Sequence, residues 1–370
     1  MKVALDYRPA LFSRAGIGRY VRELGYALAR IPGFDLHLFG HGWKRPIEGE
    51  HAGTLHRSRV PGRALPALAW IGLDAPRLAG RPAVFHWTDY VFPPIRRGGP
   101  RIVQTVHDVA FLESDAWHGA ASDRLRGRFE RAVRRADLLL CPSRATERAL
   151  ARHLPGAGEV RVIPFGVDHV HRHQASAERG RAAAHELLGT GDRYLVTVGT
   201  LEPRKNHATL LAALSHLAGR GLVIPLICIG GPGWNTARLE QRLVSGNLTF
   251  PCAWTGPIAD RSMFDLVAAA RGMVYPSSLE GFGFPPLEAL ELGLPVLAGD
   301  CAALRETAGD AALFVDGSDP AALAVAIEQL LDEPADARTK AWQQRRRAFT
   351  WAECARAHED AYTSGIEQSA

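Results

Sequence analysis

Two glutamates separated by seven residues enclose a loop rich in glycine and aromatic residues, Glu280-Gly-Phe-Gly-Phe-Pro-Pro-Leu-Glu288. The two prolines stand where the first turn of a helix tolerates proline, so a helix is expected to carry Glu288. The backbone amides of residues 282–284 would then converge at a helix N-terminus, which favours anions. The two carboxylates would lie at different depths, Glu280 at the start of the loop and Glu288 on the ligand-facing side of the helix. The alternative is a helix cap with two surface glutamates.

A second motif, Gly199-Thr-Leu-Glu-Pro-Arg204-Lys205-Asn206, follows the apolar run 194–198. Arginine offers a planar fork of donors and lysine a point charge, and the two together suit a diphosphate. Lysine is rare in this chain, since only Lys2, Lys44, Lys205 and Lys340 accompany 40 arginines among the 44 basic residues. A lysine beside an arginine at the end of an expected strand therefore favours an anion site over a solvated turn.

The sequence lacks the motifs of several other classes of enzyme and binding site. The sequence contains no GxxxxGK[ST] phosphate loop, no GxSxG nucleophile elbow and no Asp-x-Asp pair that could hold a metal-bound diphosphate. Gly16-Ile-Gly18 lacks the third glycine of a dinucleotide fingerprint. The five cysteines are widely spaced and indicate reduced thiols rather than a disulfide scaffold. The alternating histidines 169, 171 and 173 are interpreted as a solvated linker rather than a metal site.

Apolar runs alternate with helical patterns along the chain, which predicts α/β domains with parallel sheets and helices on both faces. The expected strands cover residues 3–5, 36–39, 84–86, 102–106, 138–141 and 160–163, and then 194–198, 223–229, 248–254, 273–275, 296–298 and 312–315. A polar stretch over 169–180 separates the two series and is expected to be a linker. Ligands of such sheets bind beyond the carboxyl ends of the strands, where both motifs stand.

These two motifs resemble those of the retaining GT-B nucleotide-sugar glycosyltransferases of family 4, and the segment 277–296 matches that family at nearly every position. The opening Asp6-Tyr-Arg-Pro and Gly16-Ile-Gly18-Arg-Tyr is similar to bacterial mannosyltransferases that build O-antigen and exopolysaccharide units. The resemblance implies two doubly wound, Rossmann-like domains that face each other across a cleft. Residues 1–168 would bind the acceptor and residues 169–350 the donor, with a last helix, 351–370, packing back on the first domain.

The resemblance also implies roles for the residues of the second domain. Arg204 and Lys205 would hold the donor diphosphate and stabilise the leaving group. Glu280 would contact hydroxyls of the donor sugar, and Glu288 would accept hydrogen bonds from the ribose. The remaining donor contacts would come from the backbone of Gly281, Phe282, Gly283 and Phe284.

In the first domain, the resemblance places Gly16 near the donor phosphates and His107 near the donor sugar and the reacting centre. The acceptor would be bordered by His86, Trp87, Asp89 and Tyr90. The implied reaction moves a hexose, with mannose from GDP-mannose as the leading candidate, to a saccharide or polyprenyl-diphosphate-linked acceptor in cell-surface polysaccharide synthesis. It would need no metal or other cofactor, because cations and amides would stabilise the departing diphosphate.

Charge divides unevenly along the chain. Residues 1–168 hold 26 basic and 16 acidic side chains, whereas residues 169–370 hold 18 and 23. An anionic membrane surface is one partner that suits the basic half, through the arginines of the expected helix 123–136 or the apolar segment 60–73. The alternative for 123–136, which is favoured, is an amphipathic helix with its apolar stripe on the sheet and its arginines in water. The segment 60–73 could also be a loop that grips the acceptor, or a helix packed on the core. The start of the chain shows no signal-peptide pattern, so a cytoplasmic protein is expected, peripheral on the inner face of the membrane if it binds lipid.

Three rival functions remain open at this stage. A nucleotide-sugar 2-epimerase of the same fold would need its own acid and base groups. A non-catalytic nucleotide-sugar-binding protein would not need Arg204, Lys205, Glu280 and Glu288, all of which are present. A nucleic-acid binder suits the basic half, but no RNA- or DNA-binding motif occurs.

Overall fold

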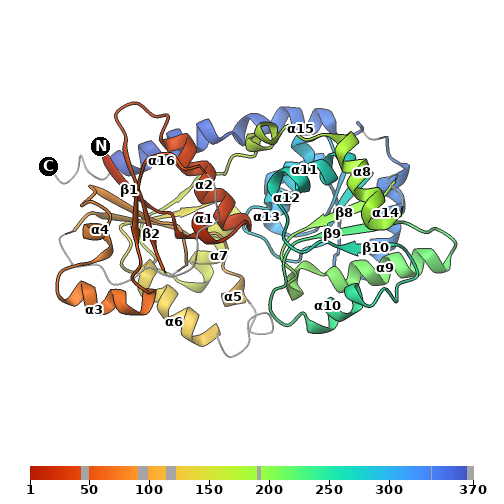
Figure 1. The fold of residues 1–370 in the computed structure, drawn as a ribbon, viewed down its shortest axis with the longest axis horizontal. Coiled ribbons are helices and arrows are strands. Elements are labelled where there is room, and N and C mark those ends of the chain that lie inside the picture. Colours follow the sequence, from red (N-terminus) through yellow and green to blue (C-terminus); the bar gives the residue numbers. More distant parts are fainter. Residues whose placement is uncertain (43–49, 91–98, 114–121, 190–192, 335, 365–370) are drawn as a thin grey trace. The chain divides into compact units, whose positions relative to one another are not determined.

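The computed structural model of this 370-residue chain describes residues 1–42, 50–90, 99–113, 122–189, 193–334 and 336–364. These residues form two compact units, which Figure 1 shows with the chain coloured from red to blue. The first unit comprises the described residues up to Gly166 and those from Phe349 onwards, and the second comprises the described residues of Val167–Ala348. The sequence had suggested boundaries at 168 and 350.

The first unit is built on a parallel sheet with the strand order β3-β2-β1-β4-β5-β6-β7. Its strands are β1 (Lys2–Asp6), β2 (Asp35–His41), β3 (Thr54–Ser58), β4 (Val84–Trp87), β5 (Arg101–Thr105), β6 (Leu138–Cys141) and β7 (Val160–Val162). Its helices are α1 (Arg8–Phe12), α2 (Gly16–Leu28), α3 (Leu65–Trp70), α4 (Ala75–Leu78), α5 (Ala110–Glu113), α6 (Ser122–Val133), α7 (Arg144–His153) and α16 (Trp351–Thr363). Helix α16 packs beside α2, from the opposite end of the chain (Figure 1).

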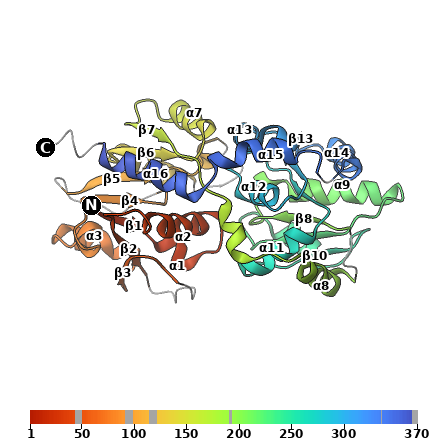
Figure 2. The same cartoon turned by 90° about the horizontal axis from the view of Figure 1, so that it is seen from above.

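The second unit contains a parallel sheet with the order β10-β9-β8-β11-β12-β13. Its strands are β8 (Leu195–Val198), β9 (Leu226–Ile229), β10 (Cys252–Trp254), β11 (Gly272–Tyr275), β12 (Val296–Gly299) and β13 (Leu313–Val315). Its helices are α8 (Ala177–Leu188), α9 (His207–Gly219), α10 (Ala237–Val244), α11 (Asp260–Ala269), α12 (Phe284–Glu291), α13 (Ala302–Ala308), α14 (Pro320–Asp332) and α15 (Thr339–Arg345). Helices α9 and α14 pack together on one side of this sheet, and α8 and α11 pack together on the other (Figure 2).

Both sheets confirm the predicted fold class, because all neighbouring strands in the described residues pair in parallel. Central strands such as β8 and β11 are buried along their whole length, as expected where helices cover both faces. The register runs without interruption from Leu195 opposite Leu226 to Val198 opposite Ile229. The loops that leave the carboxyl ends of these strands are thereby held on a rigid edge.

The expected linker over 169–180 is wrong in its second half, where α8 begins at Ala177. This helix fully buries only Gly180 and Ala184, so no large apolar residue recurs along a buried face to reveal the helix in the sequence. Gly180 lies so close to α11 that a Cβ there would be 1.9 Å from the carbonyl oxygen of Asp265. The edge strand β3 was also missed, because it is half-exposed and has a single apolar residue, Leu55.

Candidate active site

The strand order of the second unit reverses between β8 and β11, which are neighbours in the sheet. At such a switch point the loops leaving the two strands diverge, and ligands of doubly wound sheets bind between them. The loop after β8 carries Arg204 and Lys205, and the loop after β11 carries Glu280. The topology therefore brings the two motifs from the sequence to one place.

Hydrogen bonds join these two loops directly. The amide of Ser278 donates to the carbonyl oxygen of Arg204 at 2.9 Å, and Asn206 Nδ2 donates to the carbonyl oxygen of Pro276 at 2.9 Å. Asn206 has a left-handed backbone with φ of 53°, a conformation that asparagine tolerates better than most residues. The residue thus ends the turn after Arg204 and ties it to the neighbouring loop.

Arg204 lies between two carboxylates. Its Nε donates to Glu202 Oε2 at 2.8 Å, and its Nη1 lies 3.1 Å from Glu280 Oε1. The side chains of Arg204 and Glu280 are each 10% exposed. The charge of Arg204 is therefore already shared by two partners, and the guanidinium orders the carboxylates around it.

Glu280 is held as an ionised carboxylate. The hydroxyl groups of Tyr275 and Ser277 donate to its Oε1 at 2.7 and 2.9 Å. Burial by itself would raise the pKa of Glu280, but Arg204, Lys205 and these two hydroxyl groups together bring it below its ordinary value. A carboxylate fixed in this way can accept hydrogen bonds from hydroxyl groups of a ligand.

Lys205 differs from its neighbour because it forms no ion pair with any residue that the structure describes. Its ammonium lies 5.5 Å from the centre of the Tyr275 ring. Gly199 leaves room for it, since a Cβ at that position would be 2.6 Å from Lys205 Nζ. The positive charge of Lys205 is thus the one at this edge that remains available to an anion.

Helix α12 begins at Phe284 after a left-handed Gly283, whose φ is 88°. A Cβ at Gly283 would lie 2.2 Å from Leu304 Cδ2, so close packing also requires glycine there. The side chains of Phe282 and Phe284 are buried, with their ring centres 5.2 Å apart. These two aromatic residues anchor the loop in the core and fix the path of its backbone.

Glu288 is 2% exposed, and its Oε1 lies 3.0 Å from Nε2 of His169. His169 is itself 4% exposed, in the 3₁₀ helix η4 (Asp168–His173). The expected solvated linker is therefore wrong for this residue as well. The spacing of the alternating histidines contains no signal that singles out His169, because its partner is 119 residues away in the chain.

In the first unit the strand order reverses between β1 and β4, and again a charged pair stands at the switch point. Arg8, after β1, is hydrogen-bonded to Asp89, after β4, and its guanidinium lies 5.2 Å from the centre of the Trp87 ring. Arg8 was not among the site residues predicted from the sequence. Its place directly after the first strand was the signal that could have identified it.

The structure corrects the expected roles of His86 and Trp87. Both are fully buried in β4, and neither side chain reaches the surface. His86 Nδ1 lies 2.7 Å from the hydroxyl group of Tyr362, and its Nε2 lies 2.7 Å from Thr105 Oγ1. Both ring nitrogens are thus used inside the core, so His86 supports the fold rather than an acceptor. Asp89 and Tyr90 are partly exposed and remain candidates.

His107 follows β5 and is 8% exposed. Its Nε2 lies 2.9 Å from the carbonyl oxygen of Thr88, so Nε2 must carry the proton and donate it. Burial lowers the pKa of His107, which leaves a neutral ring.

Gly16 is an exposed residue at the start of α2. Gly18 is the glycine that packing requires, because a Cβ there would be 2.1 Å from the carbonyl oxygen of Ser13.

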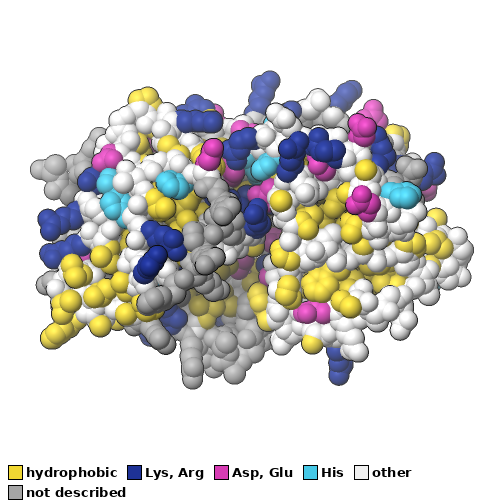
Figure 3. Space-filling view, viewed as in Figure 1, with side chains coloured by type: hydrophobic (Ala, Val, Ile, Leu, Met, Phe, Trp, Pro, Cys, Tyr) yellow, Lys and Arg dark blue, Asp and Glu magenta, His cyan; other side chains and the backbone are white. Residues whose placement is uncertain are grey.

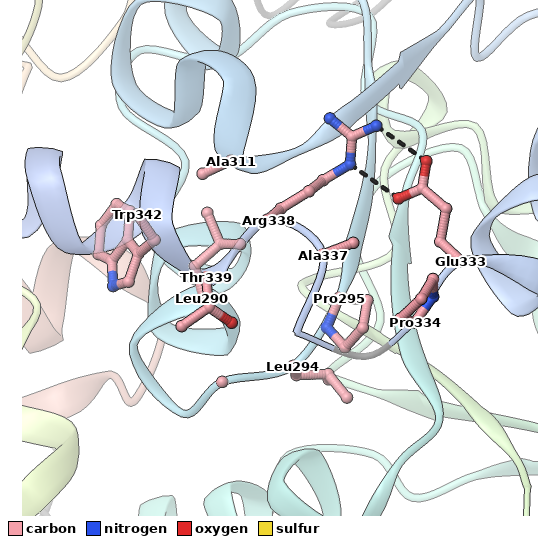
Figure 4. A pocket seen from close by; sticks show the side chains of 11 residues that line it. Leu290, Leu294, Pro295, Ala311, Glu333, Pro334, Ala337, Arg338, Thr339 and Trp342 are labelled. Carbon is pink, nitrogen blue, oxygen red and sulfur yellow. Dashed lines mark hydrogen bonds and ion pairs between the residues drawn. The ribbon is translucent and has the colours of Figure 1, made fainter.

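A separate pocket of the second unit lies near the end of α12 (Figure 4). Leu294, Pro295 and Trp342 line it, and the ion pair between Arg338 and Glu333 stands at its edge. None of the predicted site residues lines this pocket.

In the described part of the chain, no three His, Cys, Asp or Glu side chains are grouped as metal ligands. None of the described helices combines the length and apolarity needed to cross a bilayer.

Family models match both units. A model described as "Glycosyltransferase Family 4" matches residues 14–171, and one described as "Glycosyl transferases group 1" matches residues 192–333. The O-antigen chain mannosyltransferase B of Escherichia coli is 28% identical, over 98% of this chain and 99% of its own length.

Solved structures share the fold over essentially the whole chain. The sucrose-phosphate synthase of Thermosynechococcus elongatus superimposes with a TM-score of 0.77 at 23% identity, over 100% of both chains. Anabaena HepE, solved in complex with UDP-glucose, has a TM-score of 0.73 at 16% identity, over 98% of this chain and 100% of its own.

Proposed function

Since this chain belongs to the family 4-like glycosyltransferases of GT-B fold, we propose that it transfers mannose from GDP-mannose to a saccharide acceptor, with retention of the anomeric configuration. The full-length similarity to a mannosyltransferase of O-antigen chains supports both the sugar and a role in cell-surface polysaccharide synthesis. A nucleoside diphosphate sugar as donor is supported by HepE, whose structure holds UDP-glucose.

The observation that carries this proposal is the array at the β8/β11 switch point. Lys205 would meet the diphosphate as an ammonium that forms no ion pair within the described residues, while Arg204 would hold Glu280 in place beside the phosphate. Glu280 would accept hydrogen bonds from the donor sugar, and Glu288 from the ribose. Backbone amides of Gly281–Phe284 would complete the phosphate contacts of the second unit.

The chemical step would separate charge between the sugar and the diphosphate. The bond from the anomeric carbon to the β-phosphate oxygen breaks, and the acceptor oxygen forms the new bond on the same face of the sugar. The acceptor proton passes to the departing phosphate oxygen. Lys205 and the amides stabilise the negative charge that accumulates there, so the step would need no metal ion. We expect turnover to survive excess EDTA.

In the first unit, we propose that Asp89, Tyr90 and Arg8 contact the acceptor and that His107 lies near the reacting sugar. A neutral His107 with its Nε2 proton committed to Thr88 offers Nδ1 as a hydrogen-bond acceptor. Arg8 would suit an acidic or phosphorylated acceptor, such as a polyprenyl-diphosphate-linked saccharide, because its guanidinium is 27% exposed.

A lipid-linked acceptor requires the enzyme to work at a membrane, and the first unit has a surface that suits one. Trp70, Ile71 and Leu73 are 88%, 62% and 46% exposed at the end of α3. Figure 3 shows hydrophobic side chains gathered at the lower left, where Figure 1 has α3, with basic side chains beside them. Arg57, Arg59, Arg77 and Arg81 are exposed nearby in sequence. Tryptophan and arginine together are typical of surfaces that bind anionic lipid.

A thermal-shift screen tests the donor. We expect GDP and GDP-mannose to raise the melting temperature more than UDP, ADP and their sugars. Transfer to an acceptor is then measured by product mass and the anomeric proton signal. A nucleotide panel without any shift would contradict the proposal, and formation of an epimer from the donor alone would identify the 2-epimerase instead.

Vesicle flotation tests the membrane surface. We expect binding to vesicles with anionic phospholipid at low salt, weakened by Trp70→Ser. Val244→Ser is the matched control, because Val244 is 74% exposed on the second unit. Equal binding of the two variants would reject the role of α3.

A further inference from the structure

His169 is an imidazole enclosed on several sides. Its ring makes edge-to-face contacts with Phe264 of α11 and Phe284 of α12, at centre distances of 5.9 and 6.2 Å. The side chain of His169 is 1% exposed. A ring held between two aromatic side chains has little freedom to rotate, so the direction in which its Nε2 points is set by packing.

The partner of Nε2 is Glu288, whose side chain is 3% exposed. A buried carboxylate is costly unless donors compensate for the lost water, and the same holds for a buried imidazole. The 3.0 Å contact between Nε2 and Glu288 Oε1 gives the buried imidazole and the buried carboxylate a hydrogen-bond partner each. This contact, together with the burial of both side chains, restricts the orientations that the Glu288 carboxylate can adopt.

The segment 168–173 is attached to the same helix a second time. Glu291, one turn after Glu288, lies 2.6 Å from His171 Nε2 through its Oε1, and its Oε2 accepts a hydrogen bond from Trp342 Nε1 at 2.8 Å. Residues three apart on a helix share a face, and here both meet the short helix η4. His171 differs from His169 because its side chain is 54% exposed and pairs with Glu291.

We propose that His169 is a positioning residue, which orients the carboxylate of Glu288 toward the ribose hydroxyl groups of the bound nucleotide. This inference rests on the proposed function, in which Glu288 binds the ribose. A carboxylate distinguishes a diol from a deoxyribose only when its oxygens are held at the correct angle, because each hydrogen bond depends on direction. The rigid imidazole supplies that constraint from outside the ligand site.

The test compares the affinities of GDP and UDP with those of their 2′-deoxy and 3′-deoxy forms, by calorimetry on the full chain. We expect the wild type to prefer ribose, and Glu288→Gln to lose that preference. His169→Leu removes the donor and should reduce the preference by roughly tenfold. His169→Gln can place its amide nitrogen near the position of Nε2 and should keep it. His171→Leu, which loosens the other attachment, is the matched control and should also keep it.

The results separate the two proposals. Wild-type protein that binds none of these nucleotides would contradict the proposed donor site, and ribose preference retained in Glu288→Gln would contradict the role of Glu288. If the wild type and Glu288→Gln behave as expected, an unchanged preference for ribose over deoxyribose in His169→Leu overturns the positioning role. An equal loss in His171→Leu also overturns it, since the effect would then reflect general loosening of α12. If His169→Leu does not fold, His169→Asn replaces it, because its shorter amide cannot reach Glu288.

Discussion

Arg204 and Lys205 are adjacent cations with different surroundings. Arg204 is bound by Glu202 and Glu280, whereas Lys205 forms no ion pair within the described ranges. The two cations and the two carboxylates, Glu202 and Glu280, have no net charge together. Attraction for a diphosphate therefore depends on which cation can reorient toward the phosphate. Lys205 can do so without breaking an ion pair, and Arg204 cannot leave its partners without exposing two buried carboxylates.

Replacing Lys205 should therefore remove function and spare the fold. For Lys205→Ala we expect turnover to fall roughly 10²-fold or more, because a charge that stabilises the leaving group is lost. The melting temperature should stay within about 2 °C of the wild type, since the side chain makes no ion pair. Steady-state kinetics and calorimetry measure the two effects. Lys340→Ala, at an exposed lysine of the same unit, is the control and should change neither.

Asp6 gives a prediction about pH. Burial raises its pKa to about 6, with Arg8 opposing the shift. A folded-state pKa above the ordinary value means that folding favours the protonated form. The contribution of Asp6 to stability is therefore complete below about pH 4 and is lost as the pH rises through 6, by up to about 3 kcal/mol.

Urea unfolding of the wild type and Asp6→Asn from pH 4 to pH 8 isolates this contribution. The wild type should lose stability relative to the variant across that range, because asparagine does not titrate. A difference in unfolding free energy that is constant with pH would show that burial of Asp6 has no such effect.

At the scale of elements, close contact between helices α8 and α11 depends on Gly180. A methyl group there would meet the carbonyl oxygen of Asp265, and the backbone cannot move away without separating the two helices. The contact is reinforced by Arg179, which donates to both carboxylate oxygens of Asp265. This packing places α11, and with it Phe264, against His169.

Gly180→Ala should consequently destabilise the second unit by about 1–3 kcal/mol, the usual cost of overpacking. Gly219→Ala is the control, because a Cβ at this last residue of α9 would meet nothing within 4 Å. The control should be neutral or slightly stabilising, as alanine favours helices. Thermal unfolding compares the two, and equal melting temperatures would rule out the close contact.

At the scale of the whole molecule, the chain returns to complete the core of its first unit. The hydroxyl group of Tyr362 on α16 bonds to His86, and His358 lies 3.2 Å from the hydroxyl group of Tyr20. Gly166 permits the close approach of Trp351, since a Cβ at 166 would be 2.3 Å from the amide nitrogen of Trp351. The first unit therefore needs residues from both ends of the chain.

Ending the chain after Ala348 should destabilise the first unit, although the truncated protein keeps every strand of its sheet. We expect calorimetry to show a lower-temperature transition for that unit and an unchanged one for the second. A chain that ends after Ser364 keeps α16 and should unfold like the full protein. Identical thermograms for all three chains would mean that α16 contributes nothing to the first unit.

Much of this architecture could be predicted from local pattern. The central strands are short apolar runs between helices, and the two motifs at their carboxyl ends are continuous in the chain, so their residue types and spacing were sufficient to place them. Helix α8 could not be recognised, because the residues it buries are Gly180 and Ala184. Burial of a small residue leaves no hydrophobic signal.

The sequence by itself determined the fold class, the central strands and the loops that carry Arg204, Lys205 and Glu280. Only the tertiary structure decided which polar groups are paired. It placed His86 with Tyr362, 276 residues away, and His169 with Glu288. The physical reason is that the state of a histidine or carboxylate depends on its burial and its nearest donor. When that donor comes from a distant segment, no local pattern records it.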